Sequence, residues 1–150
     1  MKREEIFIRE ATNSDCANVI DLVSKVLEEF QLPFEPDSKD ADLADIESMY
    51  IQRGGIFEVL EDGKERLLGT YGLFPLNDIT CELRKMYFLP EIRGLGLGRE
   101  VLERAVNHAR RLGFQNIVLE TIGVLERAIH LYKRFGFVPV EIEHSSARVD

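Results

Sequence analysis

The sequence has no apolar run long enough to cross a membrane, and it has only two cysteines. Its longest stretch without a charged residue, Leu67 to Asn77, has 11 residues, whereas a membrane-spanning helix needs about 20. The first residues, Met1 to Ile6, include acids where a signal peptide would be apolar. Cys16 and Cys81 form neither a metal-binding spacing nor a disulfide framework. We therefore expect a cytoplasmic protein with no metal and no membrane partner.

Positive charge is also scarce. The chain carries 19 Lys and Arg against 27 Asp and Glu, a formal net charge of −8. A nucleic-acid-binding domain needs a basic surface to face the phosphates, so we expect no nucleic-acid partner. The length of 150 residues suffices for one well-packed domain and is short for two. We expect a single domain over residues 1–150.

The spacing of apolar residues predicts a mixed α/β fold. A period of two predicts strands over residues 6–8, 56–60, 66–74, 79–89, 117–120 and 137–142. A period near 3.6 predicts four helices, over residues 16–30, 43–50, 97–112 and 125–135. This order of elements predicts a mostly antiparallel sheet flanked by four helices.

One loop has the composition of an anion-binding site. Glycine occupies alternate positions in Arg93-Gly94-Leu95-Gly96-Leu97-Gly98-Arg99, between a predicted strand and a predicted helix. Glycine lets main-chain N–H groups turn toward one point, and a helix start without a side-chain cap can bind an anion. The dinucleotide fingerprint does not fit, because Arg99 stands where its third glycine belongs, and the Gly-Lys-Ser/Thr ending of a P-loop is absent. A glycine turn that only allows close packing is the alternative.

Arg93, Gly96 and Gly98 fill the pattern Arg/Gln-x-x-Gly-x-Gly/Ala, and at this loop the sequence resembles the GNAT superfamily of N-acetyltransferases. The segment Glu82–Pro90 looks like the strand before that loop, and Ala128–Phe137 is similar to the family's later helix, with Ala and Tyr followed by Gly-Phe. The resemblance covers essentially the whole chain. It implies a small, single-domain enzyme of the bacterial type with a GNAT-like fold, whose splayed fourth strand holds the cofactor.

The resemblance also implies which residues do the chemistry. Acetyl-CoA would be the co-substrate, with its diphosphate on the main-chain amides of Arg93 to Arg99 and its pantetheine arm beside a bulge near Met86 to Phe88. Tyr132 would protonate the departing thiolate, and Glu82 would be the base. The implied cofactor-binding residues are Met86, Tyr87, Phe88, Arg93, Gly94, Leu95, Gly96, Leu97, Gly98, Arg99, Leu125 and Ala128. Leu125 replaces the Asn of most relatives, so one polar contact is missing.

The expected reaction is direct attack of a primary amine on the thioester in a ternary complex. Proton transfer from an ordinary tyrosine (pKa ~10) to a thiolate (pKa ~8.5) is uphill by roughly 2 kcal/mol, so Tyr132 should assist rather than be indispensable. Each residue has a simpler interpretation: Tyr132 lies on an apolar helix stripe, and Glu82 could be a solvated charge. The alternative function is a non-catalytic acyl-CoA-binding sensor or partner-docking module.

Acidic residues concentrate between Glu28 and Glu47, where eight acids accompany Lys39 alone. This segment predicts a cationic acceptor, such as a polyamine, an amino acid amine or a basic peptide terminus. A solvated helix face is the alternative. We expect a small-molecule or peptide amine as the acceptor, and a monomer or homodimer.

Overall fold

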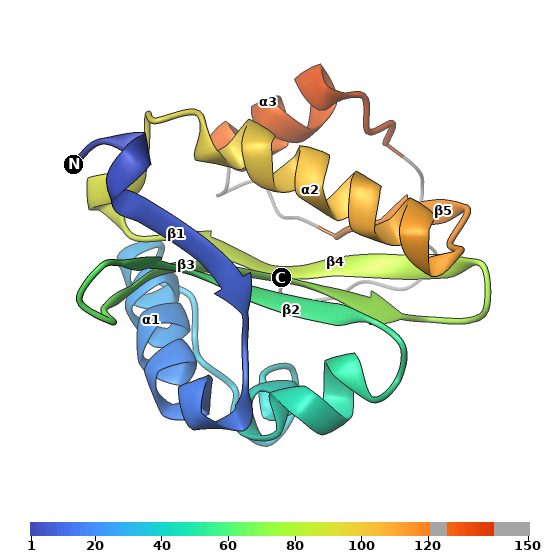
Figure 1. Cartoon of the computed structure of the whole chain (residues 1–150), viewed down its shortest axis with the longest axis horizontal. Helices are drawn as coiled ribbons and strands as arrows, with labels where there is room; N and C mark the ends of the chain where they lie inside the picture. Colours follow the sequence, from blue (N-terminus) through green and yellow to red (C-terminus); the bar gives the residue numbers. More distant parts are fainter. Residues whose placement is uncertain (121–125, 140–150) are drawn as a thin grey trace.

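The computed structural model of the chain describes residues 1–120 and 126–139, and its centre is a five-stranded sheet (Figure 1). The strands are β1 Ile6–Glu10, β2 Ile56–Asp62, β3 Leu67–Pro75, β4 Thr80–Phe88 and β5 Asn116–Val118. They lie in the order β1-β2-β3-β4-β5. The first four are antiparallel, and β5 is parallel to β4. The predicted mixed, mostly antiparallel sheet is confirmed. The last expected strand lies largely outside the described residues.

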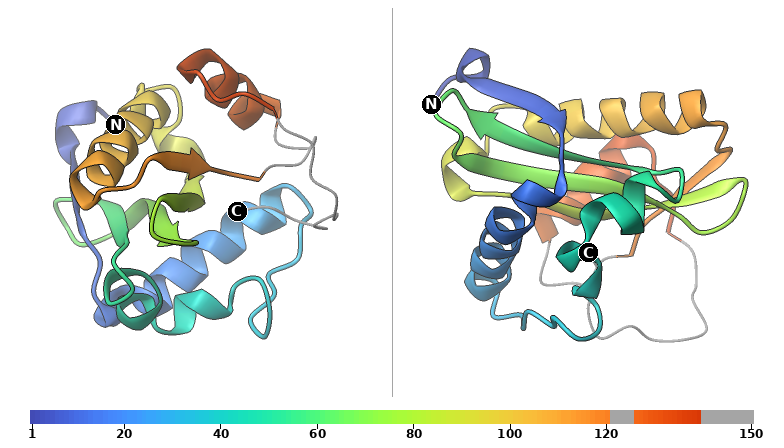
Figure 2. Two further views of the ribbon diagram at one scale, coloured as in Figure 1. Left: turned by 90° about the vertical axis from the view of Figure 1, so that its right-hand side faces the viewer. Right: turned by 60° about the horizontal axis from the view of Figure 1, so that its bottom comes forward.

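Helices cover both faces of this sheet. Helix α1 (Cys16–Glu29) packs on one face, and α2 (Leu97–Leu112) and α3 (Glu126–Phe135) lie on the other (Figures 1 and 2). Val19 and Val23 of α1 and Val101 and Ala105 of α2 are buried at a spacing of four residues, which places them on one side of each helix. The long helices therefore follow the apolar spacing of the sequence.

The second expected helix is broken into two short turns. A 3-10 turn, η3 (Ala41–Ala44), is followed by a π-helical turn, η4 (Glu47–Ile51). Asp45 separates them with an extended φ of −150°, and its carboxylate accepts the N–H of Ser48 (3.0 Å). An Asp that bonds to the main chain in this way starts a new helical turn instead of continuing the previous one. The continuous helix was a wrong prediction.

Strand β4 contains a bulge around a lysine. The β3–β4 register shifts between the pairs Thr70–Tyr87 and Gly72–Arg84, so two residues of β4, at 85 and 86, stand opposite one residue of β3. Lys85 has a φ of +56°, in the left-handed region that a residue other than glycine seldom adopts. Its carbonyl accepts a hydrogen bond from Thr70 Oγ1 (2.7 Å). The bulge thus lies at the start of the predicted segment, one residue earlier than expected.

The Lys85 ammonium is fully buried and lies among oxygen atoms. Its Nζ is 3.4 Å from Asp40 Oδ1 and 3.3 Å from Asp42 Oδ1, and it donates to the Lys39 carbonyl (3.1 Å). Asp42 also accepts the hydroxyl of Tyr50. A buried charge costs several kcal/mol unless it is paired, so these oxygens are what make the buried lysine tolerable. The cluster also holds the η3 segment against the bulge.

A second polar cluster ties α2 to the sheet. Glu58 of β2 accepts hydrogen bonds from Arg104 Nε (3.0 Å) and Nη2 (2.9 Å) of α2, and from the Tyr71 hydroxyl. Burial alone would raise the pKa of Glu58, but the hydrogen bonds from Arg104 and Tyr71 outweigh it and hold the pKa below the usual value. The carboxylate therefore stays charged and fixes the position of α2.

Lys85→Met should lower the free energy of unfolding by about 3–5 kcal/mol, because Asp40 and Asp42 would remain buried without their counter-charge. Urea denaturation measures the difference. Lys25→Met is the control, since Lys25 pairs with Asp21 on the exposed surface of α1 and should change stability by less than about 1 kcal/mol. Equal stabilities of the two variants would contradict this account of the bulge.

Candidate active site

Strands β4 and β5 separate soon after they meet. They pair only through Thr80–Asn116, Cys81–Ile117 and Glu82–Val118. Strand β5 ends there, while β4 continues to Phe88. Within the described residues, no strand runs beside β4 on this side beyond Glu82. The splayed edge can therefore take an extended ligand, and the predicted splay of the fourth strand is confirmed.

The glycine loop lies at the end of this open edge, between β4 and α2. Gly94 and Gly96 have φ values of +83° and +79°, and Gly96 precedes α2 without a side-chain cap. Among the described residues, none accepts a hydrogen bond from the six N–H groups of residues 94–99. A Cβ atom built on Gly94 or Gly96 would meet nothing within 4 Å. Amides without a partner at a helix start are suited to bind an anion.

Arg93 supports this loop instead of lining it. Its N–H donates to the Pro90 carbonyl (3.2 Å). Its guanidinium donates to both carboxylate oxygens of Glu29 (2.6 and 2.8 Å) and to the Phe88 carbonyl (2.8 Å through Nη2). These bonds connect the end of α1 to the end of β4, and they lower the pKa of Glu29. Six amides rather than the expected seven are therefore open.

Gly98 serves close packing. A Cβ atom at this position would lie 2.5 Å from Leu131 Cδ2 of α3. Glycine at this position lets α3 approach the first turn of α2 without a shift of Leu131. Close packing, the alternative explanation of the glycine-rich loop, therefore applies to Gly98. A Cβ atom at Gly94 or Gly96 would meet no described neighbour within 4 Å.

Tyr132 of α3 reaches the bulge of β4. Its side chain is buried, and its hydroxyl lies 3.9 Å from Met86 Sδ. Burial raises the pKa of Tyr132 to about 12. Ala128 precedes it by one helical turn and therefore shares its side of α3. The fold thus brings together two expected site residues that are 46 positions apart in the sequence.

Glu82 does not reach Tyr132. It lies four residues before Met86 on β4, roughly 13 Å away at the usual rise per residue. Its Oε1 accepts a hydrogen bond from Arg84 Nε. Leu125 lies outside the described residues. Of the remaining expected residues, Tyr87 and Leu97 are buried, and Met86, Phe88 and Leu95 are partly buried.

Sequence reasoning missed the structural role of Lys85. The sequence contains a signal for this role. Lys85 occupies the same set of alternate strand positions as Cys81, Leu83 and Tyr87, all of which are buried. A single charged residue in such an apolar row predicts a buried ion pair. The sequence places its partners, Asp40 and Asp42, in the acidic segment Glu28–Glu47, and nothing in their local sequence connects them with β4.

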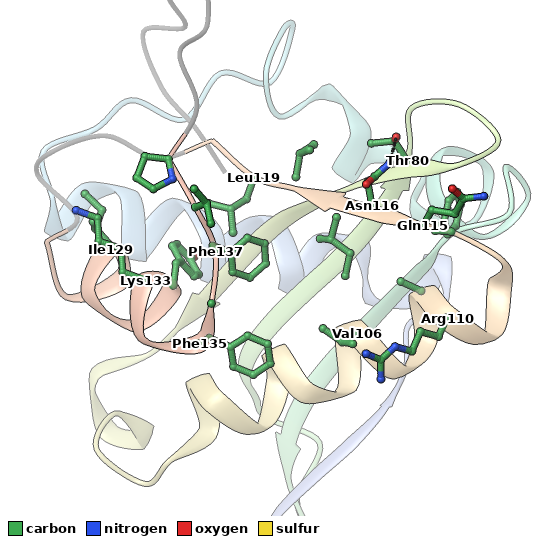
Figure 3. A pocket seen from close by; sticks show the side chains of 18 residues that line it. Thr80, Val106, Arg110, Gln115, Asn116, Leu119, Ile129, Lys133, Phe135 and Phe137 are labelled. Carbon is green, nitrogen blue, oxygen red and sulfur yellow. Dashed lines mark hydrogen bonds between the residues drawn. The ribbon is translucent and has the colours of Figure 1, made fainter.

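A cavity of about 910 Å³ opens beside Tyr132, between α2, β5 and α3 (Figure 3). Val106, Ile117, Leu119 and Phe137 are among its mostly apolar lining residues. Over residues 1–120 and 126–139, no three His, Cys, Asp or Glu side chains gather to hold a metal ion. None of the helices described there is long and apolar enough to span a membrane.

The splayed mixed sheet, whose glycine loop has amides without a partner among the described residues at its open end, agrees with the class of protein that the comparisons show, an acetyltransferase. Residues 21–137 match the family model described as Acetyltransferase (GNAT) family, and the chain belongs to the GNAT superfamily of N-acetyltransferases. Over 124 residues it is 36% identical to YjgM of Escherichia coli (strain K12), an uncharacterised N-acetyltransferase, covering 79% of this chain and 73% of that protein.

Solved structures share the fold. A GNAT-family acetyltransferase from Staphylococcus aureus Mu50 superposes with a TM-score of 0.88 at 23% identity, over 97% of this chain and 94% of that chain. A predicted acetyltransferase from Clostridium acetobutylicum, solved with acetyl-CoA, has a TM-score of 0.76 at 16% identity, over 95% and 96% of the two chains.

Gly96→Glu should weaken acetyl-CoA binding at least a hundredfold, because the new carboxylate would occupy the space in front of the open amides and repel a diphosphate. Isothermal titration calorimetry measures the dissociation constant. Gly113→Glu is the matched control: Gly113 also has a positive φ (+92°) and open space around its Cβ position, but it ends α2, roughly 24 Å away. Unchanged affinity in Gly96→Glu would remove the loop from the binding site.

Proposed function

We propose that this protein transfers an acetyl group from acetyl-CoA to a primary amine, by direct attack in a ternary complex. The observation that supports this most strongly is the row of six open amides over residues 94–99, at the end of the splayed β4 edge. A diphosphate offers the acceptors and the negative charge that such a helix start favours. Direct attack also agrees with Cys81, because burial raises the pKa of its thiol to about 11 and leaves it a poor nucleophile.

The remaining expected residues have positions that suit this role. The main chain of Met86, Tyr87 and Phe88 would pair with the pantetheine arm along the open edge of β4. Arg93 would position the loop through Glu29 and the Phe88 carbonyl. Further contacts would come from Leu95, Leu97, Arg99 and Ala128, and the family resemblance alone adds Leu125, which lies outside the described residues.

Tyr132 would stabilise the departing thiolate by a hydrogen bond. With its pKa raised to about 12, full proton transfer to a thiolate of pKa ~8.5 is uphill by about 5 kcal/mol. The only partner of the hydroxyl among the described residues is Met86 Sδ, a weak acceptor. The hydroxyl can therefore turn toward the leaving sulfur at little cost.

Tyr132→Phe should lower kcat by roughly ten- to a hundredfold and leave the KM for acetyl-CoA nearly unchanged. The shape of the pH profile between pH 6 and 9 should not change, because a phenol with a pKa of about 12 stays protonated throughout. Steady-state thiol release measures both quantities. His130→Gln, an exposed change on the same helix, should match the wild type. A tyrosine-dependent pH step near neutrality would contradict this role.

Glu82 would accept the proton of the amine, directly or through water. An ordinary ammonium has a pKa of ~10.4, so deprotonation costs about 4.6 kcal/mol at pH 7. Arg84 occupies Oε1 of Glu82, and no described residue donates to Oε2. We assign Oε2 as the proton acceptor.

Glu82→Gln should lower kcat/KM by roughly a hundredfold at pH 7, and the deficit should shrink as the pH rises toward 10. The reason is that the amine loses its own proton in this range and then needs no base. Initial rates from pH 6 to 10 provide the comparison. A deficit that is the same at every pH would rule out Glu82 as the base.

The acidic segment Glu28–Glu47 contributes less charge to the surface than the sequence indicates. Asp40 and Asp42 pair with Lys85, and Glu29 pairs with Arg93. The other five acids would attract the positive charge that the acceptor amine carries in water. We also place the reaction in the cytoplasm, where the two free thiols of Cys16 and Cys81 would stay reduced.

A thiol-release screen with acetyl-CoA and a panel of amines tests the proposed reaction. Release of CoA with at least one amine, at a rate that depends on Glu82, is the expected result. Binding of acetyl-CoA without thiol release across the whole panel would overturn the enzyme and favour the non-catalytic binding module.

A further inference from the structure

Two arginines converge on one aromatic ring before the bulge of β4. The guanidinium carbon of Arg84 lies 3.9 Å from the ring centroid of Phe74, and that of Arg53 lies 5.2 Å from the same centroid. Tyr50 packs its ring edgewise against Phe74, with the centroids 5.7 Å apart. Residues from η4, β3, β4 and the turn after η4 thus build this cluster, which we call the arginine pair.

The arginine pair carries an excess of positive charge. Glu82 pairs with Arg84, but in the part of the chain that the structure describes Arg53 has no carboxylate within ion-pair distance and contacts Met49 Sδ (3.7 Å). Glu82 offsets the charge of Arg84, so the charge that a further anion would offset is that of Arg53. Stacking on an aromatic ring orients each planar guanidinium and leaves its N–H edge for a carboxylate.

This cluster adjoins the place where the amine would react. Arg84 precedes Met86 by two residues, so their Cα atoms are at most roughly 7 Å apart. Met86 contacts the Tyr132 hydroxyl, and Glu82, the assigned base, is bonded to Arg84. The Arg84 guanidinium would therefore lie close to any amine that gives its proton to Glu82.

We propose that Arg84 and Arg53 bind a carboxylate of the acceptor, so that the substrate is an amino acid or a similar small molecule with its amine and carboxylate a few bonds apart. This inference rests on the proposed function. The acids of residues 28–47 and Glu82 suit the ammonium end of such a zwitterion, and the arginine pair suits the carboxylate end. A polyamine would bring further positive charge to the two guanidinium groups and is disfavoured.

Matched acceptor pairs test the inference. Thiol release is measured at saturating acetyl-CoA with standard amino acids and with the corresponding α-carboxamides, which keep the amine and the shape but lose the negative charge. The KM of each accepted amino acid should be at least tenfold lower than that of its carboxamide. Arg53→Gln and Arg84→Gln should each raise the KM of the amino acid about tenfold and leave that of the carboxamide nearly unchanged.

Three further variants complete the design. Arg84→Lys keeps the charge but loses the forked donors, so it should fall between the wild type and Arg84→Gln. Arg66→Gln removes an exposed arginine that pairs with Glu91, and it should leave both KM values unchanged. Arg84→Gln also leaves Glu82 without its partner, so urea denaturation of this variant is compared with that of the double change Glu82→Gln with Arg84→Gln, which removes both partners. The double change is not used for rates, because Glu82 is the assigned base. Arg53→Gln tests the pair without disturbing that bond.

Equal KM values for amino acids and carboxamides in the wild type would overturn the inference, as would a preference that survives both arginine substitutions. Absence of thiol release with every amine would overturn the proposed reaction instead. The subsite is then judged by calorimetry with glycine and glycinamide in the presence of CoA. Binding of glycine alone, lost in Arg53→Gln, supports the subsite, and equal or absent binding of the two probes overturns it.

Discussion

The structure depends on one buried charge, the ammonium of Lys85. Its residue occupies a left-handed backbone angle inside a strand, and its side chain would be intolerable without Asp40 and Asp42. Formation of these ion pairs stabilises the bulge and the η3 segment together, since neither carboxylates nor lysine can be buried alone. A strand irregularity is thereby coupled to a segment more than 40 residues away.

The bulge in turn organises the site. It begins three residues after the last pair of β4 with β5, and its Met86 contacts the Tyr132 hydroxyl, so the open strand edge meets α3 there. At the far end of that edge, Arg93 anchors the glycine loop to α1 and β4. The side chain of Arg93 thus positions the loop through Glu29 and the Phe88 carbonyl.

Some charges of the chain pair within the fold, and others remain available to the proposed acceptor. Three acids of the Glu28–Glu47 segment neutralise Lys85 and Arg93, while the arginine pair on Phe74 keeps a positive charge in a protein whose net charge is −8. Local charge counts therefore misjudge the acceptor side. The pairing partners lie far apart in the chain, and only the fold shows which charges remain.

The sequence by itself determined the order and type of the main elements, because apolar periods of two and 3.6 decide which face of each strand and helix is buried. It also indicated a loop with unpaired amides, since glycine at alternate positions before a helix leaves the first N–H groups without a side-chain cap, and it placed Tyr132 on the inner side of α3. The break at Asp45 depends on a short-range bond to Ser48, which the apolar period of this segment does not reveal. The tertiary structure alone decided that Asp40 and Asp42 are the partners of Lys85 and that Gly98 packs against Leu131, because these contacts join segments distant in sequence.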